Sequence, residues 1–600
     1  MISGPYRNVR LGPSDVVVDR RDDGSILVRS PHPLGRYPKK MTEPLDHWAR
    51  HASYRTFLAQ REPKFGWRNV TYAEARFFAR RIGQALLNRG LSVERPVVVL
   101  SGNEIEHALL GIGCMYAGVP YAPISTAYSL VSKDFGKLRH IFELLTPGLV
   151  YASDGLRYER AIRAVMPPDA ELVVNMNLIP GATHFGDLVD VEPDASLDEA
   201  HARVHPDTVF KILFTSGSTD MPKGVINTHR MWASNQEQAR AFFKFLEDEP
   251  PVIVDWLPWN HTFGGNADLG LVLYNGGTLY IDRGRPAPGL FEETLHTLRR
   301  IAPTMYWNVP RGFEFLIPHL RSDAAFRKHF FSRLRLLYYA GAGLSQKVWD
   351  DLAEIAQEEC GERILLLTGL GSTETAPHAL FGLKDSDRPG LVGVPAPGID
   401  LKLVPLGNGK LEARLRGPNI TPGYWRRLDL TRAAFDDEGF YKLGDSLQFV
   451  DEKDPGKGFV FDGRIAEDFK LSSGTWVSVG PLRARFISHC APYVQDVVIA
   501  GHDREFVGAL IFLTPEGREL PDVQGRFATF LESFSTTATG TSNRIAAALV
   551  LDEPPSIDAH EITDKGSINQ RAVLKNRSAL VEELYTPSER TIRITGNLNV

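Results

Sequence analysis

The sequence predicts an α/β protein with a large, multi-layered N-terminal domain of α/β subdomains and a smaller α+β C-terminal domain. Three observations support this prediction. The chain has 600 residues, more than a single hydrophobic core usually accommodates. Short apolar runs alternate with amphipathic stretches over most of its length. After about residue 461 these elements become shorter.

The elements of the large domain follow an N-terminal arm. Residues 1–43 are rich in Arg, Asp, Pro and Gly and are expected to lie over the surface as an irregular segment. Apolar residues three and four apart predict a helix that starts near Tyr72 and ends at Gly90, a typical C-cap residue. The runs PVVVL (96–100) and TPGLVYA (146–152) have the composition of buried strands.

The same alternation recurs further along the large domain. RLRLLYYAGAG (333–343) is a strand that enters a glycine turn, and a helix is predicted over 345–359. RILLLTGLGSTE (363–374) is another strand ending in a glycine turn. Strands that alternate with helices predict mostly parallel sheets, with ligands at the carboxyl ends of the strands. We place this domain at residues 44–465 and the small domain, with strand-like DVVIAG and GALIFL, at 466–600.

Composition excludes several classes of protein. A formal net charge of −5 offers no broad basic surface for nucleic acid. The three cysteines, Cys114, Cys360 and Cys490, are too far apart in sequence to indicate a disulfide framework or a zinc cluster. No apolar run approaches the roughly 18 to 20 residues of a membrane helix, and no apolar stretch follows the charged start as in a secretory signal. We expect a cytoplasmic protein with no nucleic-acid or membrane partner.

The most informative segment is LFTSGSTDMPKGV. An apolar strand ends at Phe214 and is followed by five small or hydroxylated residues: Thr215, Ser216, Gly217, Ser218 and Thr219. Small residues let backbone amides approach a polyphosphate, hydroxyls add donors, and Lys223 supplies a cation. The alternative is a polar surface loop, but such a run directly after a strand is unusual for a linker. The segment is not a Walker A loop, because Gly224 follows the lysine where that motif has Ser or Thr.

This loop resembles the signature YTSGTTGxPKG of the adenylate-forming superfamily, which includes acyl-CoA synthetases, luciferases and the adenylation domains of peptide synthetases. It departs from that pattern at Phe214, Ser218 and Asp220. The resemblance implies ATP, Mg²⁺ and coenzyme A as cofactors, and a small C-terminal domain that rotates between two half-reactions.

TGLGSTE resembles the YGxTE motif of the same superfamily. The resemblance implies that Thr373 contacts the α-phosphate and that Glu374 holds Mg²⁺, which prefers one or two carboxylates together with phosphate oxygens. Read alone, the glutamate would be a helix-start residue. The adenine is expected to lie against two groups of residues: Gly341 and Ala342, and Gly369, Leu370 and Gly371. Leu370 stands where the family usually has an aromatic residue.

Three further segments agree in order and spacing. GKLEARLRGPNITPGYW resembles GExxVRGxxxxxGY, with Lys410 where Glu is usual. YKLGD resembles YxTGD, which implies that Asp445 binds the ribose hydroxyls. GRIAEDFKLSSG resembles GRxxDxIKxxG, so Arg464 would meet ribose and phosphates and Lys470 would act in the thioester-forming state. Ala466 takes the hinge position, where Asp or Lys is common.

The catalytic lysine of the family lies in a C-terminal loop, written PxTxxGKxxR. This chain has EITDKGSINQR, and counting from Thr563 assigns the role to Lys565. By this resemblance Lys565 neutralises charge at the reacting carboxylate and α-phosphate. Loss of one such preorganised charge typically lowers the rate by about 10²- to 10³-fold.

DWLPWNHTFGGN resembles the PxxHxxG segment that borders the family's acyl pocket, which implies that His261 lies beside the carboxylate. Other residues expected around the acid are Trp259, Phe263, Gly264, Asn308, Gly341 and Gly369. Aromatic residues gather in these segments, and flat apolar walls suit a planar acid better than a long flexible tail.

The stretch TSNRIAAALVLDEPPSIDAHEITDKGSINQRAVL is similar to the feruloyl-CoA synthase branch. This implies a ligase that activates a hydroxycinnamic acid such as ferulic acid as acyl-AMP and transfers it to coenzyme A, releasing AMP and pyrophosphate. The alternatives are a fatty or benzoic acid–CoA ligase, an enzyme that loads a carrier protein, and a nucleotide-binding homologue with impaired catalysis. Free coenzyme A is favoured because no carrier-attachment motif precedes Val600. A homodimer is left open.

Overall fold

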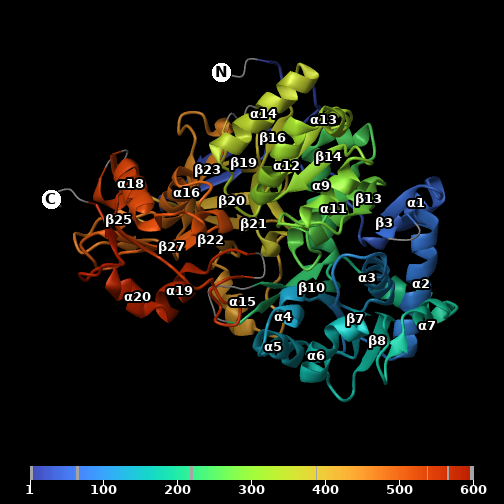
Figure 1. Cartoon of the computed structure of the whole chain (residues 1–600). Coiled ribbons are helices and arrows are strands. Elements are labelled where there is room, and N and C mark those ends of the chain that lie inside the picture. The colour runs from blue at the N-terminus through green and yellow to red at the C-terminus, as the bar shows by residue number, and fades with distance from the viewer. Residues whose placement is uncertain are drawn as a thin grey trace.

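A computed structural model describes residues 4–62, 66–215, 221–384, 386, 388–407, 409–536, 538, 540–563 and 566–594. The protein is a mixed α/β structure with a large N-terminal domain and a smaller C-terminal domain, which confirms the predicted fold class. The C-terminal elements, orange to red in Figure 1, gather on one side of the large domain. We call residues 469–594 the lid.

The first sheet has seven strands in the order β11-β10-β6-β5-β7-β8-β9 and is parallel except for the β10–β11 pair. Its strands are β5 (Val97–Leu100), β6 (Tyr121–Pro123), β7 (Leu149–Asp154), β8 (Glu171–Met176), β9 (Thr183–His184), β10 (Val209–Thr215) and β11 (Lys223–Thr228). The runs PVVVL and TPGLVYA form β5 and β7, as predicted. Helix α2 (Tyr72–Asn88) packs on α3 (Ile105–Ala117), and Gly90 follows α2 with a φ of +67° that favours glycine.

Two smaller sheets complete the α/β layers. One is β12 (Val252–Asp255), β13 (Thr278–Ile281), β3 (Thr56–Glu62) and β4 (Gly66–Thr71); the other is the parallel set β14 (Met305–Asn308), β15 (Leu336–Tyr339) and β16 (Leu365–Leu367). Helices α12 (Pro310–Ser322), α13 (Ala324–Phe331) and α14 (Gln346–Cys360) share a hydrophobic core with the second sheet. Ser345 caps α14, so the predicted strand–turn–helix is present.

The remaining helices of the large domain connect these layers. They are α1 (Thr42–His51), α4 (Thr126–Leu130), α5 (Gly136–Leu145), α6 (Gly155–Val165), α7 (Gly186–Val189), α8 (Ala195–Arg203), α9 (His229–Phe242), α10 (Leu269–Asn275), α11 (Phe291–Leu298) and α15 (Leu428–Ala434).

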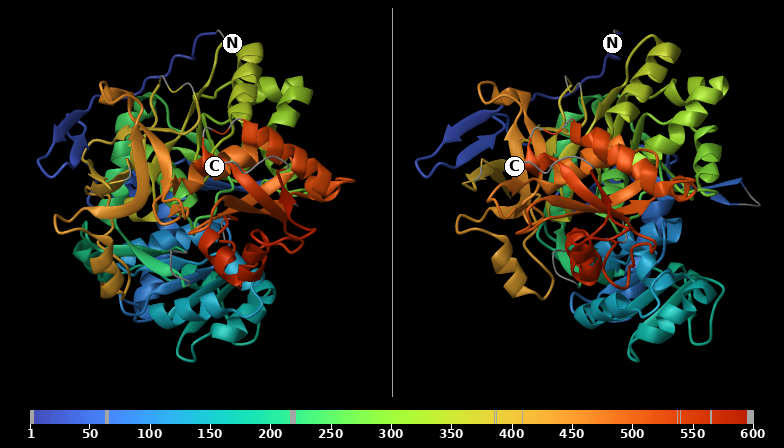
Figure 2. Two further views of the ribbon diagram at one scale, coloured as in Figure 1. Left: turned by 90° about the vertical axis from the view of Figure 1, so that its left-hand side faces the viewer. Right: turned by 60° about the vertical axis from the view of Figure 1, so that its left-hand side comes forward.

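A nine-stranded antiparallel sheet, which the sequence pattern did not predict, lies beside the α/β layers. Its order is β1 (Val17–Arg20), β2 (Ile26–Arg29), β20 (Asp400–Pro405), β21 (Leu411–Arg416), β22 (Tyr441–Phe449), β23 (Phe459–Arg464), β19 (Leu391–Pro395), β18 (His378–Phe381) and β17 (Gly369–Gly371). The N-terminal arm is therefore not irregular throughout. Its β1–β2 hairpin pairs with β20, and Figure 2 shows this blue hairpin beside the orange strands.

The lid is an α+β unit. Strands β26 (Val494–Ala500), β27 (Val507–Leu513), β28 (Ile545–Val550) and β29 (Ile592–Arg593) form its sheet, after the short pair β24 (Phe469–Lys470) and β25 (Trp476–Val477). Its helices are α16 (Val479–His489), α17 (Pro515–Arg518), α18 (Val523–Thr536), α19 (Gln570–Asn576) and α20 (Ser578–Glu583). Two hydrophobic clusters of its own, one on each side of the sheet, indicate that it packs as a separate domain.

Candidate active site

The two ends of the predicted phosphate loop are brought together by β10 and β11. These strands are antiparallel, and Thr215 at the end of β10 pairs with Lys223 at the start of β11. The remaining residues predicted to bind phosphate lie outside the described part of the chain: Ser216, Gly217, Ser218 and Thr219. The strand that enters the loop is present as predicted, and the loop's own contacts stay a prediction.

Lys223 faces a carboxylate across a tyrosine. Its Nζ donates to the Tyr424 hydroxyl at 3.2 Å and lies 4.3 Å from the centre of that ring. The Tyr424 hydroxyl in turn donates to Glu374 Oε1 at 2.9 Å. Burial lowers the pKa of Lys223, and the nearby Glu374 carboxylate opposes that change. One cation and one carboxylate thus lie together beside the loop, the pair that an ATP–metal complex requires.

Strand β17 and the 3₁₀ turn η3 (Thr373–Thr375) position the next two predicted residues. Ser372 caps the turn, since its side-chain oxygen accepts a hydrogen bond from the Glu374 amide at 3.2 Å. Thr373 and Glu374 are both buried. A side chain at Gly371 would place its Cβ 1.7 Å from the Pro377 carbonyl oxygen, so the turn depends on glycine there.

The residues expected around the adenine belong to two different environments. Gly341 and Ala342 form an exposed turn after β15, and Gly341 has a φ of +84°. Gly369 is crowded, because a Cβ there would lie 2.3 Å from the Leu380 carbonyl oxygen. The side chain of Leu370 belongs to the main hydrophobic core.

Asp445 and Arg464 are cross-strand neighbours on β22 and β23. Arg464 Nε lies 3.8 Å from Asp445 Oδ1, and the Arg464 side chain is largely exposed. Burial raises the pKa of the Asp445 carboxyl to about 6, while Arg464 acts in the opposite direction. A buried carboxylate beside an arginine is an arrangement suited to ribose hydroxyls, and the ribose-binding role of Asp445 stays a prediction.

His261 lies in the segment between β12 and a π-helix, η2 (Phe263–Asp268). Asn103 holds the start of this segment: its Nδ2 donates to the Leu257 carbonyl and its Oδ1 accepts from the Trp259 amide, both at 2.9 Å. Gly264 must be glycine, since a Cβ would lie 2.1 Å from the Leu257 carbonyl oxygen. π-Helical turns leave backbone carbonyls for other donors and often mark functional sites.

Two buried side chains donate hydrogen bonds to backbone carbonyls of this π-helix, and neither side chain was predicted from the sequence. Lys211, on β10, is fully buried and donates from Nζ to the Gly265 carbonyl at 2.9 Å. Trp232 Nε1 donates to the Asn266 carbonyl at 2.8 Å and its ring lies 4.7 Å from the Lys211 amine. Burial lowers the pKa of Lys211 to about 7. The signal in the sequence is a lysine inside the apolar strand VFKILF.

A pair of aspartates brackets the same segment. Asp255 ends β12 and Asp268 ends the π-helix, and both are fully buried. Burial raises the pKa of Asp255 to about 7, and burial together with the neighbouring Asp255 raises that of Asp268 further. Two carboxyl groups in contact cannot both ionise at low cost, so the pair shares a proton.

Aromatic rings form a continuous wall behind the His261 segment. Trp307, from β14, stacks on Tyr338, from β15, with ring centres 4.4 Å apart. Phe263 lies 5.8 Å from Trp307, and His378 lies 5.6 Å from both Trp307 and Tyr338. Burial lowers the pKa of His378 to about 3, so this ring is neutral. Phe263 was predicted at the pocket, whereas His378 was not.

The other two residues predicted around the acid have partners in the protein. Trp259 is buried, and its ring lies 5.2 Å from His107. Asn308 Nδ2 donates to the Tyr306 hydroxyl at 2.9 Å, and its Oδ1 accepts from the Val309 amide at 2.8 Å. In this structure the side chains of Trp259 and Asn308 contact other residues of the protein, and their contact with substrate stays a prediction.

The chain matches the family model described as AMP-binding enzyme over residues 45–425, and that of the AMP-binding enzyme C-terminal domain over residues 469–589. The chain belongs to the AMP-binding enzyme family. The two matches follow one another along the chain, as the large domain and the lid do, and the general resemblance inferred from the motifs is confirmed.

Several members of the AMP-binding enzyme family are similar to this chain. Luciferin 4-monooxygenase of Photinus pyralis is 26% identical over 74% of the chain and 78% of its own length. The carboxylic acid reductase of Mycobacterium marinum is 26% identical over 82% of the chain, which spans 44% of that longer protein. The 4-hydroxybenzoate–CoA/benzoate–CoA ligase of Rhodopseudomonas palustris is 25% identical over 73% of the chain and 77% of its own length.

Solved structures agree on the fold. An anthranilate CoA ligase in complex with anthranoyl-AMP has a TM-score of 0.71 at 22% identity, over 92% of this chain and 99% of that one. The ATP-bound MatB of Rhodopseudomonas palustris has a TM-score of 0.66 at 21% identity, over 90% and 99% of the two chains. None of these relatives is a feruloyl-CoA synthase.

Two lysines of the lid were predicted to act in this AMP-binding enzyme, and the structure describes only one of them. Lys470, on β24, is exposed and lies 5.0 Å from the ring centre of Trp476. Lys565 lies outside the described residues, and its flanks, Thr563 and Gly566, are joined by a hydrogen bond of 3.0 Å. The catalytic assignment of Lys565 therefore stays a prediction.

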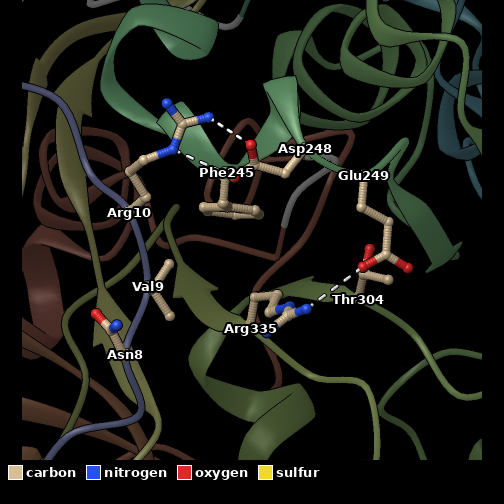
Figure 3. A pocket seen from close by; sticks show the side chains of 8 residues that line it. All are labelled: Asn8, Val9, Arg10, Phe245, Asp248, Glu249, Thr304 and Arg335. Carbon is tan, nitrogen blue, oxygen red and sulfur yellow. Dashed lines mark hydrogen bonds and ion pairs between the residues drawn. The ribbon is translucent and has the colours of Figure 1, made fainter.

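A surface cavity of about 230 Å³ lies at the N-terminal arm of this AMP-binding enzyme (Figure 3). Arg10 pairs there with Asp248 at 2.6 Å, and Arg335 with Glu249 at 3.6 Å. None of the predicted site residues lines it. Because its charges are already paired, we interpret it as the seam where the arm packs on the large domain. No helix within the described ranges has the length and apolar character to cross a membrane.

Proposed function

We propose that this AMP-binding enzyme couples an aromatic carboxylic acid, of the hydroxycinnamic type such as ferulic acid, to coenzyme A through an acyl-AMP intermediate. The observation that carries the proposal is the cluster of aromatic rings formed by Phe263, Trp307, Tyr338 and His378, in which Trp307 stacks on Tyr338 and the other two rings meet them at an angle. Flat, neutral rings favour a flat ring in the ligand, since offset stacking adds to the burial of apolar area.

In the first half-reaction an oxygen of the substrate carboxylate attacks the α-phosphorus of ATP. A bond forms between them, the bond from that phosphorus to the α–β bridging oxygen breaks, and pyrophosphate leaves with that oxygen and the electron pair. Lys223 neutralises charge on the leaving phosphates, Asp445 fixes the ribose, and the Asn103 and Lys211 contacts fix the segment that carries His261. Positioning and preorganised charge are the protein's main contributions.

Glu374 fits the Mg²⁺ that the family uses. It is a single buried carboxylate beside the phosphate-binding lysine, and Mg²⁺ favours one or two carboxylates together with phosphate oxygens. Bound there, the ion would supply charge stabilisation at the phosphates. Within the described ranges no group of three or more His, Cys, Asp or Glu is arranged to hold a metal without the nucleotide.

In the second half-reaction the coenzyme A thiolate attacks the carbonyl carbon of acyl-AMP. A carbon–sulfur bond forms, the carbon–oxygen bond to AMP breaks, and AMP leaves with the electron pair. We assign Lys470 to this step, after the lid has turned about Ala466 and carried Lys565 away. Hinges of this kind need a few torsions to change rather than a particular side chain, so alanine is compatible with the role.

Names of several relatives support an aromatic acid. They include the benzoate and 4-hydroxybenzoate ligase, a 4-coumarate–CoA ligase of Narcissus pseudonarcissus at 25% identity, and the anthranilate CoA ligase. A second candidate is transfer of the acyl group to a carrier protein, because two carboxylic acid reductases are also among the relatives. A long-chain fatty acid ligase is a third, more distant possibility at 23% identity.

The test compares acids and acceptors separately. Ferulate, 4-coumarate, benzoate and octanoate are compared by acid-dependent exchange of pyrophosphate into ATP, and we expect ferulate or coumarate to give the highest rate. Coenzyme A and a phosphopantetheinylated carrier protein are then compared as acceptors of the feruloyl group. Absence of exchange with every acid would disprove adenylation by this chain. Preference for octanoate, or for the carrier, would replace only the substrate or acceptor assignment.

A further inference from the structure

The lid contacts the large domain at a place remote from the chain junction. Ile557 and Asp558 lie in the loop between β28 and α19, the same loop that carries Lys565 further on. They contact the segment 132–137, which comprises the turn before α5 and the first two residues of that helix in the large domain. We call these interactions the docking contact. Ile557 and Asp558 belong to the C-terminal stretch that is similar to the feruloyl-CoA synthase branch, but no nucleotide-binding or catalytic motif identified in the sequence includes a residue of the docking contact.

In the docking contact both oxygens of one carboxylate accept hydrogen bonds. Asp558 Oδ1 accepts from the Ser132 hydroxyl at 2.7 Å, and Asp558 Oδ2 accepts from the Lys133 amide at 3.0 Å. Lys137 Nζ donates to the Ile557 carbonyl at 2.8 Å. Hydrogen bonds to an ionised acceptor are stronger than neutral ones and demand a defined geometry. A carboxylate held at both oxygens therefore fixes where this loop lies.

The large-domain side of the contact is rigid. The Ser132 hydroxyl accepts from the Phe135 amide at 3.1 Å and so shapes the turn that starts α5. Lys137 is buried, and the Ile557 side chain packs on the cluster that contains Phe214 and Trp425. Phe214 is the penultimate residue of β10, directly before the phosphate loop.

Helix α5 also contacts the far end of the phosphate loop. His140, one turn beyond Lys137, has its Nε2 3.2 Å from the Pro222 carbonyl oxygen. Pro222 directly precedes Lys223. One short helix thus touches both the lid loop and the loop predicted to hold the phosphates, so the position of the lid is tied to the nucleotide side of the site.

We infer that Asp558 is a positioning residue for adenylation: its contact with Ser132 and Lys133 holds the lid against the large domain while acyl-AMP forms, and the contact opens before the thiol reacts. The inference rests on the proposed function, because it needs two half-reactions that use different lid positions. It adds a docking carboxylate on the lid and the turn before α5 that binds it. Asp558 itself does not touch the substrates.

The test measures the two half-reactions of Asp558→Ala separately. Acid-dependent pyrophosphate exchange should fall about 10- to 100-fold, as expected for loss of two hydrogen bonds to a charged group. Thioester formation from preformed feruloyl-AMP and coenzyme A should stay at the wild-type rate or rise. Ser132→Ala should give a smaller loss of the same kind, and the double variant should be no slower than Asp558→Ala.

Asp552→Ala is the matched control. Asp552 lies in the same loop and carries the same charge, but it is exposed and pairs with Arg590 inside the lid at 3.3 Å. Both half-reactions of this variant should match the wild type. A second measurement joins Ser132→Cys and Asp558→Cys by a short, non-reducible thiol crosslinker, after which acyl-AMP should still form while thioester formation stops.

Wild-type exchange in Asp558→Ala, an equal fall in both half-reactions, or thioester formation by the crosslinked protein would each overturn the inference. Failure of the proposed function has a different signature, since the wild-type protein would then show no exchange with any acid.

Discussion

The acid side and the lid side of the site are stabilised by different kinds of contact. On the acid side, Asn103, Lys211 and Trp232 hold the His261 segment through hydrogen bonds inside the core. On the lid side, Asp558 and Lys410 make polar contacts between domains, near the surface or the chain junction. Buried hydrogen bonds are costly to break, whereas contacts between domains can exchange for water.

These two kinds of contact suit two different tasks. We expect the acid side to keep one geometry in both half-reactions, because the hydrogen bonds that hold its π-helix come from buried side chains. The lid side has to hold one pose for adenylation and release it for thioester formation. Substitutions on the acid side should therefore affect both half-reactions, while those on the lid side should affect one of them.

The largest effect is expected for Lys565→Ala. Removing the assigned lysine should lower pyrophosphate exchange by about 10²- to 10³-fold, since one preorganised charge at the α-phosphate is lost. Thioester formation from preformed acyl-AMP should change little. Exposed Lys575→Ala, on α19 of the lid, is the control. An equal loss in both half-reactions would show that Lys565 does not act in adenylation alone. An unchanged rate of pyrophosphate exchange would show that Lys565 is not the catalytic lysine.

Lys211→Met tests the acid side. The variant removes a buried amine and leaves the Gly265 carbonyl without this donor, so both half-reactions should slow together, by about tenfold. Stability should respond in the opposite sense. A fully buried amine is unfavourable while it is protonated, even with one hydrogen bond to a carbonyl, so the variant should have the higher thermal midpoint near pH 7.

That stability difference should depend on pH in a defined direction. With a native pKa of about 7 against 10.5 in the unfolded chain, Lys211 binds fewer protons in the native state between these values. The stability of the wild type therefore rises with pH across this window, by up to about 1.4 kcal/mol per pH unit, and the advantage of Lys211→Met should shrink. A constant difference in thermal midpoint from pH 7 to 10 would contradict this account.

Asp445 provides a test of the nucleotide side. Only the ionised carboxylate accepts hydrogen bonds from both ribose hydroxyls, and its raised pKa of about 6 means that protonation competes with binding at mildly acid pH. The dissociation constant of an acyl-sulfamoyl adenosine, which lacks a titrating phosphate, should increase about tenfold from pH 7 to pH 5. Asp445→Asn should bind weakly and with little pH dependence. Equal pH profiles for the two proteins would remove Asp445 from the ribose site.

The motif residues assigned to the nucleotide side and the buried residues of the acid side differ in how they could be found from the sequence, and the reason is physical. Thr373, Glu374, Asp445 and Arg464 lie on short stretches whose own backbone path sets their position, so a motif read along the chain is sufficient. His378 and Lys211 reach the acid side from β18 and β10, and only the packing of those strands brings them there.

The fold shows the same division. The parallel strands and α2 follow directly from apolar spacing. The antiparallel sheet was missed because its strands are long-range partners, such as β2 with β20. A local signal for the hairpin did exist, since two apolar runs flank the turn-forming DDGS near Gly24.

The smallest effect, and the finest test of the comparison, is expected at Lys410. This residue of the large domain donates from Nζ to the Asp462 carbonyl at 2.8 Å and pairs with the Asp468 carboxylate, so its contacts lie on both sides of Ala466. The Asp468 side chain is only 3% exposed. Lys410 thus joins the two sides of the junction, and we expect it to stabilise the lid pose seen here.

Lys410→Met should lower pyrophosphate exchange about three- to tenfold at pH 8, because a buried carboxylate is left without its cation. Burial already raises the pKa of Asp468 and Lys410 opposes that change, so the variant should raise it further. Protonated Asp468 needs no cation, and the defect should therefore become smaller as pH falls from 8 to 5.5. Exposed Lys453→Met is the control. A defect that stays constant with pH, or that slows thioester formation equally, would mean that Lys410 merely supports the sheet and that the lid pose is held elsewhere.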